Sequence, residues 1–470
     1  MSVAAPSSVL HEVSSLAGVF DSVARAEPVC LAGRVVALRG LSVIVEDLPM
    51  PVGTLVHIHT SFGGVIPAEL VGFTGRQGVV MMLAQSSGVR PGDSVVGVRS
   101  SPVAMVGPGM LGRCINGMGE PIDGLGPMAG LSPMPLSPEP VPAMRRQPIH
   151  ERLATGVRAI DTMLTLGRGQ RLGVFAGPGV GKSTLLGAIS RQSDADVNVI
   201  ALIGERGREV KDFIAHSLGP QGLAKSIVVV ATGDESPVLR VRASRLACAA
   251  AEHFRDRGKS VLLMMDSITR FAHAQRQIGL SIGEPPATKG YTPSVYAGLA
   301  LLLERAGAIL NQDGSPSGSI TGLYTILVEG DDMTEPIADA ARGILDGHVM
   351  LSRKLAQQAH YPAIDVLDSV SRVADDVCDR DHVHARHALR RLLSAYADVA
   401  ELVQIGAYAK GSNPEADVAI ELRGRVLELL HQSRDSSGKP ASFDESRSEL
   451  IKIAALSTDL KQRLIRTKAA

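Results

Sequence analysis

Residues 171–186 constrain the fold of this chain more than any other stretch. They read RLGVFAGPGVGKSTLL: a short apolar run, a glycine-rich turn and the apolar start of a helix. A strand, a glycine-rich loop and a helix in this order are what a phosphate-binding P-loop requires. Glycines let backbone N–H groups wrap closely around a phosphate, and the N-terminus of the following helix adds a positive dipole end. The stretch therefore predicts a nucleotide-binding α/β domain.

The residues of this loop have specific predicted roles. We expect Lys182 to reach the β and γ phosphates and to act in catalysis, and Ser183 to hold Mg²⁺, so ATP and Mg²⁺ are the expected cofactors. Ala176 stands where the strict motif has glycine, and a chance Gly-Lys-Ser loop is the alternative that the flanking strand and helix disfavour. Pro178 has no N–H to donate to a phosphate. The predicted nucleotide-binding residues of the loop are Gly177, Pro178, Gly179, Val180, Gly181, Lys182, Ser183 and Thr184.

Apolar runs alternate with helical segments from residue 151 to residue 375. Runs such as NVIALIG and SVLLMMD are apolar throughout, as expected of strands buried on both faces of a parallel sheet. The alternation predicts an α/β fold, a mostly parallel sheet covered by helices, for this P-loop ATPase domain. The predicted strands are 171–176, 198–204, 226–232, 260–266 and 319–329.

The rest of the chain divides into four further regions. Residues 1–28 predict an amphipathic arm, which either packs on its own domain or binds a partner. Residues 29–100 contain short strand-like runs broken by Gly, Pro and Asp, and predict a small β-barrel domain. Residues 101–150 form a connector rich in turn residues. Residues 376–470 predict a helical domain whose last helix carries one apolar face, made of Leu450, Ile453, Leu456, Leu460 and Leu464.

Two carboxylates follow predicted buried strands. Asp266 ends SVLLMMD, where a P-loop protein has its second Mg²⁺-site residue, and a helix N-cap is its alternative role. Glu205 follows another strand, at the sheet edge where ligands bind, and could polarise the water that attacks the γ-phosphate. Arg206 is a further catalytic candidate and Glu209 a further metal candidate in the same GERGREV segment. A surface ion-pair cluster is the alternative for this charged run.

Composition argues against a nucleic-acid-binding protein, and the pattern of apolar residues argues against a secreted or membrane-spanning one. The 470 residues carry a formal net charge of zero, 3% aromatic residues and no Trp, so neither a basic surface nor a base-stacking platform for nucleic acid is expected. The N-terminal sequence has no basic segment followed by an apolar run, and no apolar run approaches 18 residues. We therefore expect neither a signal peptide nor a membrane span.

Several segments, in order, resemble the catalytic subunits of rotary-type ATPases. They are GPGVGKST, GERGREV, LLMMDSITR, GEPPATKGYTPSV and PAIDVLDSVSR, and residues 362–371 fit the signature of that superfamily. Residues 146–171, 175–186, 318–353 and 360–373 are similar to its type III secretion ATPase branch. Residues 405–420, IGAYAKGSNPEADVAI, are similar to the flagellar export ATPases within that branch. The resemblance covers residues 30–430.

The resemblance implies a RecA-like core and a homohexameric ring with nucleotide at each subunit interface. Arg372 matches the arginine finger of the family, which would reach the γ-phosphate held by the neighbouring subunit. Tyr361 matches the aromatic residue that stacks on adenine, and Tyr408 lies where a second adenine wall is expected; core packing is the alternative for both. Glu205 stands where the non-catalytic subunits of rotary synthases have Gln, so one polypeptide carries both halves of a catalytic site.

The resemblance also implies a function and partners. The expected function is ATP hydrolysis that energises protein export into the growing flagellum. The expected partners are a regulatory stator-like dimer on the N-terminal arm, a coiled-coil stalk protein in the ring pore, export chaperones with cargo, and a membrane export gate. The expected location is cytoplasmic, at the inner face of the inner membrane.

Three alternatives to this function stay open from the sequence. The first is a virulence injectisome ATPase from the same branch. The second is a ring-shaped RNA translocase of the termination-factor type, which needs a basic, aromatic barrel that residues 29–100 do not provide. The third is a scaffold that binds nucleotide without hydrolysing it, against which Glu205 and Arg372 together argue.

Overall fold

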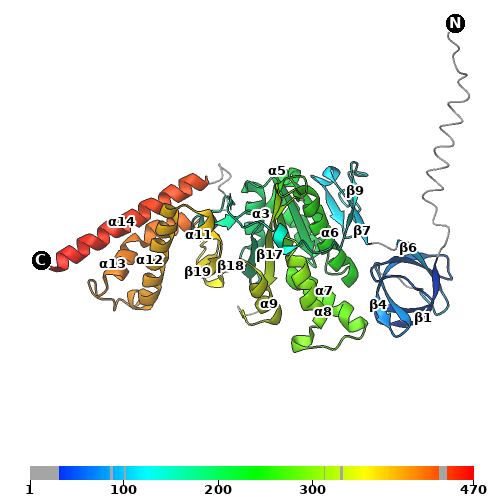
Figure 1. The fold of residues 1–470 in the computed structure, drawn as a ribbon. Helices are drawn as coiled ribbons and strands as arrows, with labels where there is room; N and C mark the ends of the chain where they lie inside the picture. The colour runs from blue at the N-terminus through cyan, green and yellow to red at the C-terminus, as the bar shows by residue number, and fades with distance from the viewer. Residues whose placement is uncertain are drawn as a thin grey trace, which may run out of the picture. The chain divides into compact units, whose positions relative to one another are not determined.

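A computed structural model of the protein describes residues 31–84, 88–99, 102–311, 313–328, 332–432 and 442–469. The chain divides into two compact units, Met1–Ser101 and Pro102–Ala470 (Figure 1). The predicted arm at residues 1–28 lies outside the described residues. Within the described residues, no helix combines the length and the apolar character needed to cross a membrane.

The first unit is a closed antiparallel barrel, which confirms the predicted β-barrel. Its strands follow one another in the order β1-β2-β5-β4-β3-β6. Their bounds are β1 (Ala32–Arg39), β2 (Ser42–Glu46), β3 (Leu55–His59), β4 (Val65–Thr74), β5 (Gln77–Met82) and β6 (Ser94–Arg99). The alternating side chains fill the interior, where the fully buried residues include Val43, Val45, Val56, Ile58, Leu70, Val80 and Val95.

The second unit is built on a nine-stranded sheet with the order β19-β18-β12-β17-β15-β13-β14-β8, and β16 pairs with β17. All pairs in it are parallel except β18 with β19 and β16 with β17. The strands are β8 (Cys114–Asn116), β12 (Arg171–Ala176), β13 (Val197–Ile203), β14 (Ser226–Ala231), β15 (Ser260–Asp266), β16 (Gly307–Leu310), β17 (Pro316–Leu327), β18 (Gly347–Leu351) and β19 (Ile364–Ser371).

The five predicted strands of this sheet are confirmed to within a few residues. The sequence prediction missed β8, β16, β18 and β19. β8 has only three residues and comes from the predicted connector. β18 and β19 alternate buried and partly exposed residues, because they lie at the end of the sheet, so they lack the continuous apolar run of a central strand.

Helices of the second unit pack on the sheet and on one another (Figure 1). Those of the α/β part are α2 (Arg158–Met163), α3 (Lys182–Gln192), α4 (Gly207–Asp212), the π-helical η3 (Phe213–Leu218), α5 (Gly219–Ala224), α6 (Pro237–Arg255), α7 (Ile268–Ser281), α8 (Pro293–Leu303), α9 (Pro336–Ile344), α10 (Arg353–Gln357) and α11 (Ala374–Val377). Short elements complete it: β7 (Val103–Val106), η1 (Pro108–Met110), β9 (Ser132–Pro135), η2 (Ala143–Arg145), β10 (Arg152–Leu153), β11 (Leu166–Gly167) and η4 (Thr288–Gly290).

Three long helices end the chain: α12 (Arg380–Gln404), α13 (Pro414–Leu430) and α14 (Phe443–Ala469). Asp379 caps α12 by accepting from the His382 N–H, and Asn413 caps α13 in the same way. The predicted apolar face of the last helix is confirmed. Leu450 and Ile453 are fully buried, and the core cluster they belong to also contacts Leu456, Leu460 and Leu464.

Candidate active site

The P-loop lies between two firmly packed elements. β12 pairs on both sides, with β17 and with β18, and ends at the buried Ala176. α3 begins at Lys182 and is anchored by its buried residues Leu185, Leu186 and Ile189. Gly179 and Gly181 have φ of 78° and 95°, a left-handed backbone that glycine adopts without strain. The local sequence therefore specifies a fixed loop at the carboxyl end of a central strand.

Lys182 lies at the centre of a cluster drawn from three strands. Its Nζ is 2.6 Å from Asp266 Oδ1 and 3.3 Å from Glu205 Oε1. Asp266 ends β15 and Glu205 follows β13, so the parallel sheet brings both carboxylates to the edge where β12 delivers the P-loop. From β17, the Thr325 hydroxyl donates to Asp266 Oδ1 at 2.7 Å. All four side chains are buried or nearly so.

Burial and charge shift the protonation of this cluster. Burial lowers the pKa of Lys182, but the attraction of Asp266 and Glu205 outweighs it, so the pKa of Lys182 is raised and its ammonium stays charged. Burial raises the pKa of Glu205, and the nearby charge of Asp266 adds to this rise, while Lys182 opposes it. A carboxylate with a raised pKa is a stronger base than an exposed glutamate, which suits the polarisation of a water molecule.

Arg206 and Glu209 lie further out than Glu205. Arg206 occupies the N-cap position of α4 but its side chain does not cap the helix. Its guanidinium is 3.4 Å from Glu209 Oε1, and both side chains are substantially exposed. For this pair the surface ion-pair interpretation fits the geometry. Glu209 also contributes to the raised pKa of Glu205 through a side-chain hydrogen bond. Their catalytic and metal-binding roles stay predictions.

Tyr361 lies directly against the P-loop. Two of its ring carbons would lie 3.6 Å from a Cβ atom at Gly181, and its side chain is only partly buried. Its hydroxyl donates to Ala356 O at 3.3 Å. An exposed ring face beside the phosphate loop is what adenine stacking needs. Tyr408 lies between α12 and α13, where its hydroxyl donates to Asp417 Oδ1 at 3.0 Å, and its adenine role stays a prediction.

Arg372 lies at the opposite edge of the sheet from Lys182. It follows β19, which runs antiparallel to β18, and Ser371 pairs with Gly347 at the amino end of β18. β18 runs parallel to β12, with Gly173 opposite His348, so Arg372 lies beside the start of the P-loop strand. At about 3.3 Å per residue, roughly 13 Å of strand separates this edge from the P-loop. That is further than an arginine side chain reaches, so Arg372 cannot serve the P-loop of its own subunit.

Comparison with known proteins identifies the family of this chain. Residues 156–371 match the ATP synthase alpha/beta family, nucleotide-binding domain, and residues 378–452 match the T3SS EscN ATPase C-terminal domain. The flagellum-specific ATP synthase of Bacillus subtilis is 47% identical over 423 residues, 90% of this chain and 94% of that protein. The chain belongs to the ATP synthase alpha/beta family. Its activity is therefore that of an ATPase.

Within the family, the similarity extends to both branches of type III export. The type 3 secretion system ATPase of Xanthomonas euvesicatoria is 46% identical over 404 residues, 86% of this chain and 90% of that protein. The solved structure of the assembled ATPase EscN in complex with its central stalk EscO, from enteropathogenic E. coli, has a TM-score of 0.81 and 38% identity, and covers 90% of this chain and all of that one. ATP-driven type III export is thus the function that this family membership supports.

Two further residues of the ATPase site were not predicted from the sequence. Thr325 holds Asp266, and its only signal was a polar residue inside the apolar run GLYTILV. Arg270, four residues after Asp266, packs its side chain against Gly204, and its Nε is buried without a hydrogen-bond partner in the structure. Arg270 is the last residue of the LLMMDSITR motif, so the sequence did mark this position.

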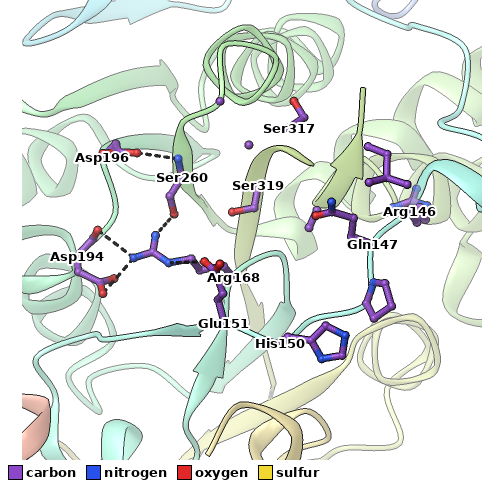
Figure 2. A pocket seen from close by; sticks show the side chains of 15 residues that line it. Arg146, Gln147, His150, Glu151, Arg168, Asp194, Asp196, Ser260, Ser317 and Ser319 are labelled. Carbon is purple, nitrogen blue, oxygen red and sulfur yellow. Dashed lines mark hydrogen bonds and ion pairs between the residues drawn. The ribbon is translucent and has the colours of Figure 1, made fainter. Parts of the chain in front are cut away.

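A separate cavity of about 720 Å³ lies away from the ATPase site (Figure 2). Its wall includes Ser260 and Ser319, from the amino ends of β15 and β17, so it opens at the sheet edge opposite Lys182. Arg168 crosses it and pairs with Asp194 at 3.1 Å and with the Ser260 hydroxyl. The cavity contains no residue that the sequence assigned to nucleotide.

Proposed function

We propose that this protein is the ATPase of flagellar type III export and that it works as a homohexameric ring with catalytic sites shared between neighbouring subunits. The observation that carries the shared site is the position of Arg372, at the sheet edge opposite its own P-loop. A ring in which each subunit presents one edge to the next brings the two edges together. The proposed finger then completes the site of the neighbour and contributes about 10³–10⁵ in rate.

The geometry supports the following proposed roles. Lys182 binds the β and γ phosphates, and its raised pKa keeps it charged while it does so. Glu205 orients and polarises the attacking water, and Tyr361 stacks on adenine. Arg372 of the neighbouring subunit stabilises the charge that develops on the transferred phosphoryl group.

The donor set at this edge fits Mg²⁺. The Ser183 hydroxyl and the Asp266 carboxylate are hard oxygen ligands of the kind that Mg²⁺ prefers. Two carboxylates against one lysine leave the cluster with an excess negative charge, which a divalent cation would neutralise. When bound, Mg²⁺ would offset the negative charge of the phosphates. Asp266 would hold it directly or through water.

The partners are proposed by analogy with relatives. EscN has been solved in complex with its central stalk EscO, so we propose a coiled-coil stalk protein in the pore of this ring. We also propose a regulatory dimer on the N-terminal arm, export chaperones with cargo, and a membrane export gate at the inner membrane. The flagellar role is favoured because residues 405–420 are similar to flagellar export ATPases; the injectisome role is the second candidate, supported by the Xanthomonas relative.

Mixed rings test the shared site. Lys182→Ala and Arg372→Ala should each be nearly inactive alone. Mixed in equal amounts before assembly, they should regain activity, because about one site in four then combines an intact P-loop with an intact neighbouring finger. Full activity in the dilute monomer, unaffected by Arg372→Ala, would refute the proposal. Expression in strains lacking either export ATPase distinguishes the roles: restored swimming supports the flagellar one, and restored secretion by the injectisome alone opposes it.

A further inference from the structure

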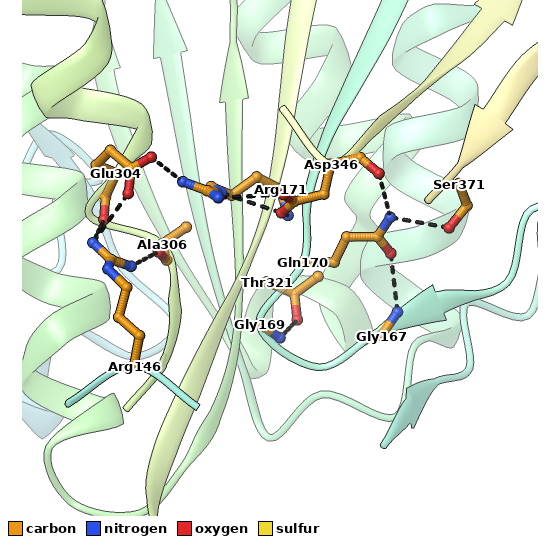
Figure 3. Close-up of polar contacts among 10 residues, drawn as sticks. All are labelled: Arg146, Gly167, Gly169, Gln170, Arg171, Glu304, Ala306, Thr321, Asp346 and Ser371. Atoms are coloured by element: carbon orange, nitrogen blue, oxygen red, sulfur yellow. Dashed lines mark hydrogen bonds and ion pairs between the residues drawn. The ribbon is translucent and has the colours of Figure 1, made fainter. Parts of the chain in front are cut away.

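Gln170, the residue before the P-loop strand, contacts Ser371, which directly precedes Arg372 in the chain (Figure 3). The Arg372 N–H donates to Asp346 O at 3.0 Å. Gln170, which is fully buried, uses its side-chain NH₂ group to donate to the same carbonyl at 3.3 Å and to Ser371 Oγ at 3.0 Å. The Gln170 NH₂ group therefore holds both Ser371, the residue before Arg372, and the Asp346 carbonyl that accepts from the Arg372 N–H.

The neighbours of Gln170 fix how its amide is oriented. Its Oε1 accepts from the Gly167 N–H at 3.0 Å, which leaves the NH₂ group for Asp346 and Ser371. The Ser371 hydroxyl donates to Thr165 O at 3.0 Å, so its oxygen is free to accept from Gln170. Every polar atom of the Gln170 side chain is thus paired, as a buried amide requires.

A second set of contacts, made by Arg171, ties Asp346 to the first residue of β12. The Arg171 N–H donates to Asp346 Oδ2 at 3.0 Å, and the Arg171 guanidinium donates to both carboxylate oxygens at 3.1 and 3.2 Å. The Asp346 N–H in turn donates to Arg171 O at 2.8 Å. Asp346 cannot move without moving the start of β12. The acceptor of the Arg372 N–H is therefore fixed to the strand that carries the P-loop.

We infer that Gln170 is a positioning residue for Arg372: its amide fixes the backbone from which the guanidinium extends to the nucleotide of the neighbouring subunit. This rests on the proposed function, because Arg372 must first act in trans. Arg372 itself is exposed, so its anchoring comes from the backbone and from the residues beside it. An error of about 1 Å in a group that stabilises the transition state can cost about 10²-fold in rate, which is why such an anchor matters.

A structural role in the sheet is the competing explanation, and Asn198 provides a matched control for it. Asn198 is also fully buried in the same sheet, on β13. Its NH₂ group likewise donates to one carbonyl and one serine hydroxyl, Ser190 O at 2.8 Å and Ser226 Oγ at 3.2 Å. These contacts are the same in kind as those of Gln170 but do not involve the segment of Arg372.

The test compares Gln170→Met with Asn198→Leu, each close in shape to the amide it replaces. We expect Gln170→Met to lower kcat about 10- to 100-fold with little change in KM, whereas Asn198→Leu keeps the wild-type kcat. In an Arg372→Ala background, Gln170→Met should have no further effect on kcat, because the group it positions is gone. Assembly and thermal unfolding of each ring are measured alongside; if Gln170→Met does not assemble, Ser371→Ala takes its place.

Mixed rings give a measurement that a folding defect in Gln170→Met would not change. Lys182→Ala subunits supply intact fingers to the P-loops of Gln170→Met subunits, so the mixture should exceed the activity of Gln170→Met alone. An equal loss of kcat from Gln170→Met with and without Arg372 would overturn the inference while leaving the shared site intact. A wild-type rate in Arg372→Ala alone would instead refute the shared site on which the inference rests.

Discussion

Removing the Thr325 hydroxyl tests how strongly the Asp266 carboxylate depends on Thr325, its second hydrogen-bond partner beside Lys182. Thr325 is fully buried, and its Oγ1 lies 2.7 Å from Asp266 Oδ1 and 3.3 Å from Met265 O. The hydroxyl has one proton to donate, and it donates to the charged Asp266 Oδ1, which is the nearer acceptor. Thr325→Val keeps the side-chain shape and removes only this hydrogen bond.

The size of the effect follows from what Asp266 retains. A hydrogen bond to a charged group contributes about 1.5–3 kcal/mol. Because Lys182 Nζ stays 2.6 Å from the same oxygen, the carboxylate is not left unpaired, and the lower end applies. About 1.5 kcal/mol corresponds to roughly a tenfold lower kcat/KM for MgATP. Since Asp266 is proposed to hold Mg²⁺, half-maximal activity should also need more Mg²⁺.

Steady-state ATPase assays across Mg²⁺ concentrations check this prediction. Thr162→Val is the matched control, because Thr162 is also fully buried and its hydroxyl donates to Arg158 O at 2.7 Å, away from Asp266. The control should lose stability without changing the Mg²⁺ dependence. If Thr325→Val gave the same kcat/KM and the same Mg²⁺ dependence as the wild type, the hydroxyl would serve packing alone and the reasoning would fail.

Three further predictions follow from single residues. Glu205 is proposed to act as a base in its ionised form, and its pKa is raised. On lowering the pH, kcat/KM should therefore begin to fall at a higher pH than an ordinary glutamate would give, and Glu205→Gln should lack this acidic limb of the pH profile. Tyr361→Ala should raise KM for ATP about tenfold through lost stacking, and Tyr361→Phe should not, as nucleotide titration would reveal. Asp379 accepts from the Nε–H and one NH₂ group of Arg447, each at 2.8 Å, and from the His382 N–H, which lowers its pKa to about 2. Asp379→Ala should therefore cost about 1 kcal/mol in thermal unfolding at neutral pH, and this difference should shrink as pH falls from 3.8 through about 2.

The centre of the site could be predicted because its signals are local. The strands at 171–176 and 260–266 were predicted with their observed bounds, since continuous apolar runs mark strands buried on both faces. Once those strands are parallel, their carboxyl ends share one edge, and Lys182, Glu205 and Asp266 must converge there. Their convergence follows from the parallel strands alone and depends on no other contact between distant residues.

The anchor of Arg372 could not be predicted for the opposite reason. Gln170 bonds to Asp346 and Ser371, which are 176 and 201 positions away in the chain. No spacing in the sequence links them, because their contact depends on β18 and β19 returning to the P-loop strand. Those two strands were missed, since their alternating side chains do not give the apolar signal of a central strand.

The direction of one strand decides which site Arg372 can serve. Had β19 run parallel to β18, its last residue would lie at the carboxyl edge of the sheet, beside the P-loop of the same subunit. Because β19 runs antiparallel, its end returns to the amino edge, and Arg372 lies away from the P-loop of its own subunit. In a chain with this topology, Arg372 and the P-loop of the same subunit lie at opposite edges of one sheet and cannot meet. We therefore propose that hydrolysis depends on assembly because of strand order, before any contact between subunits is considered.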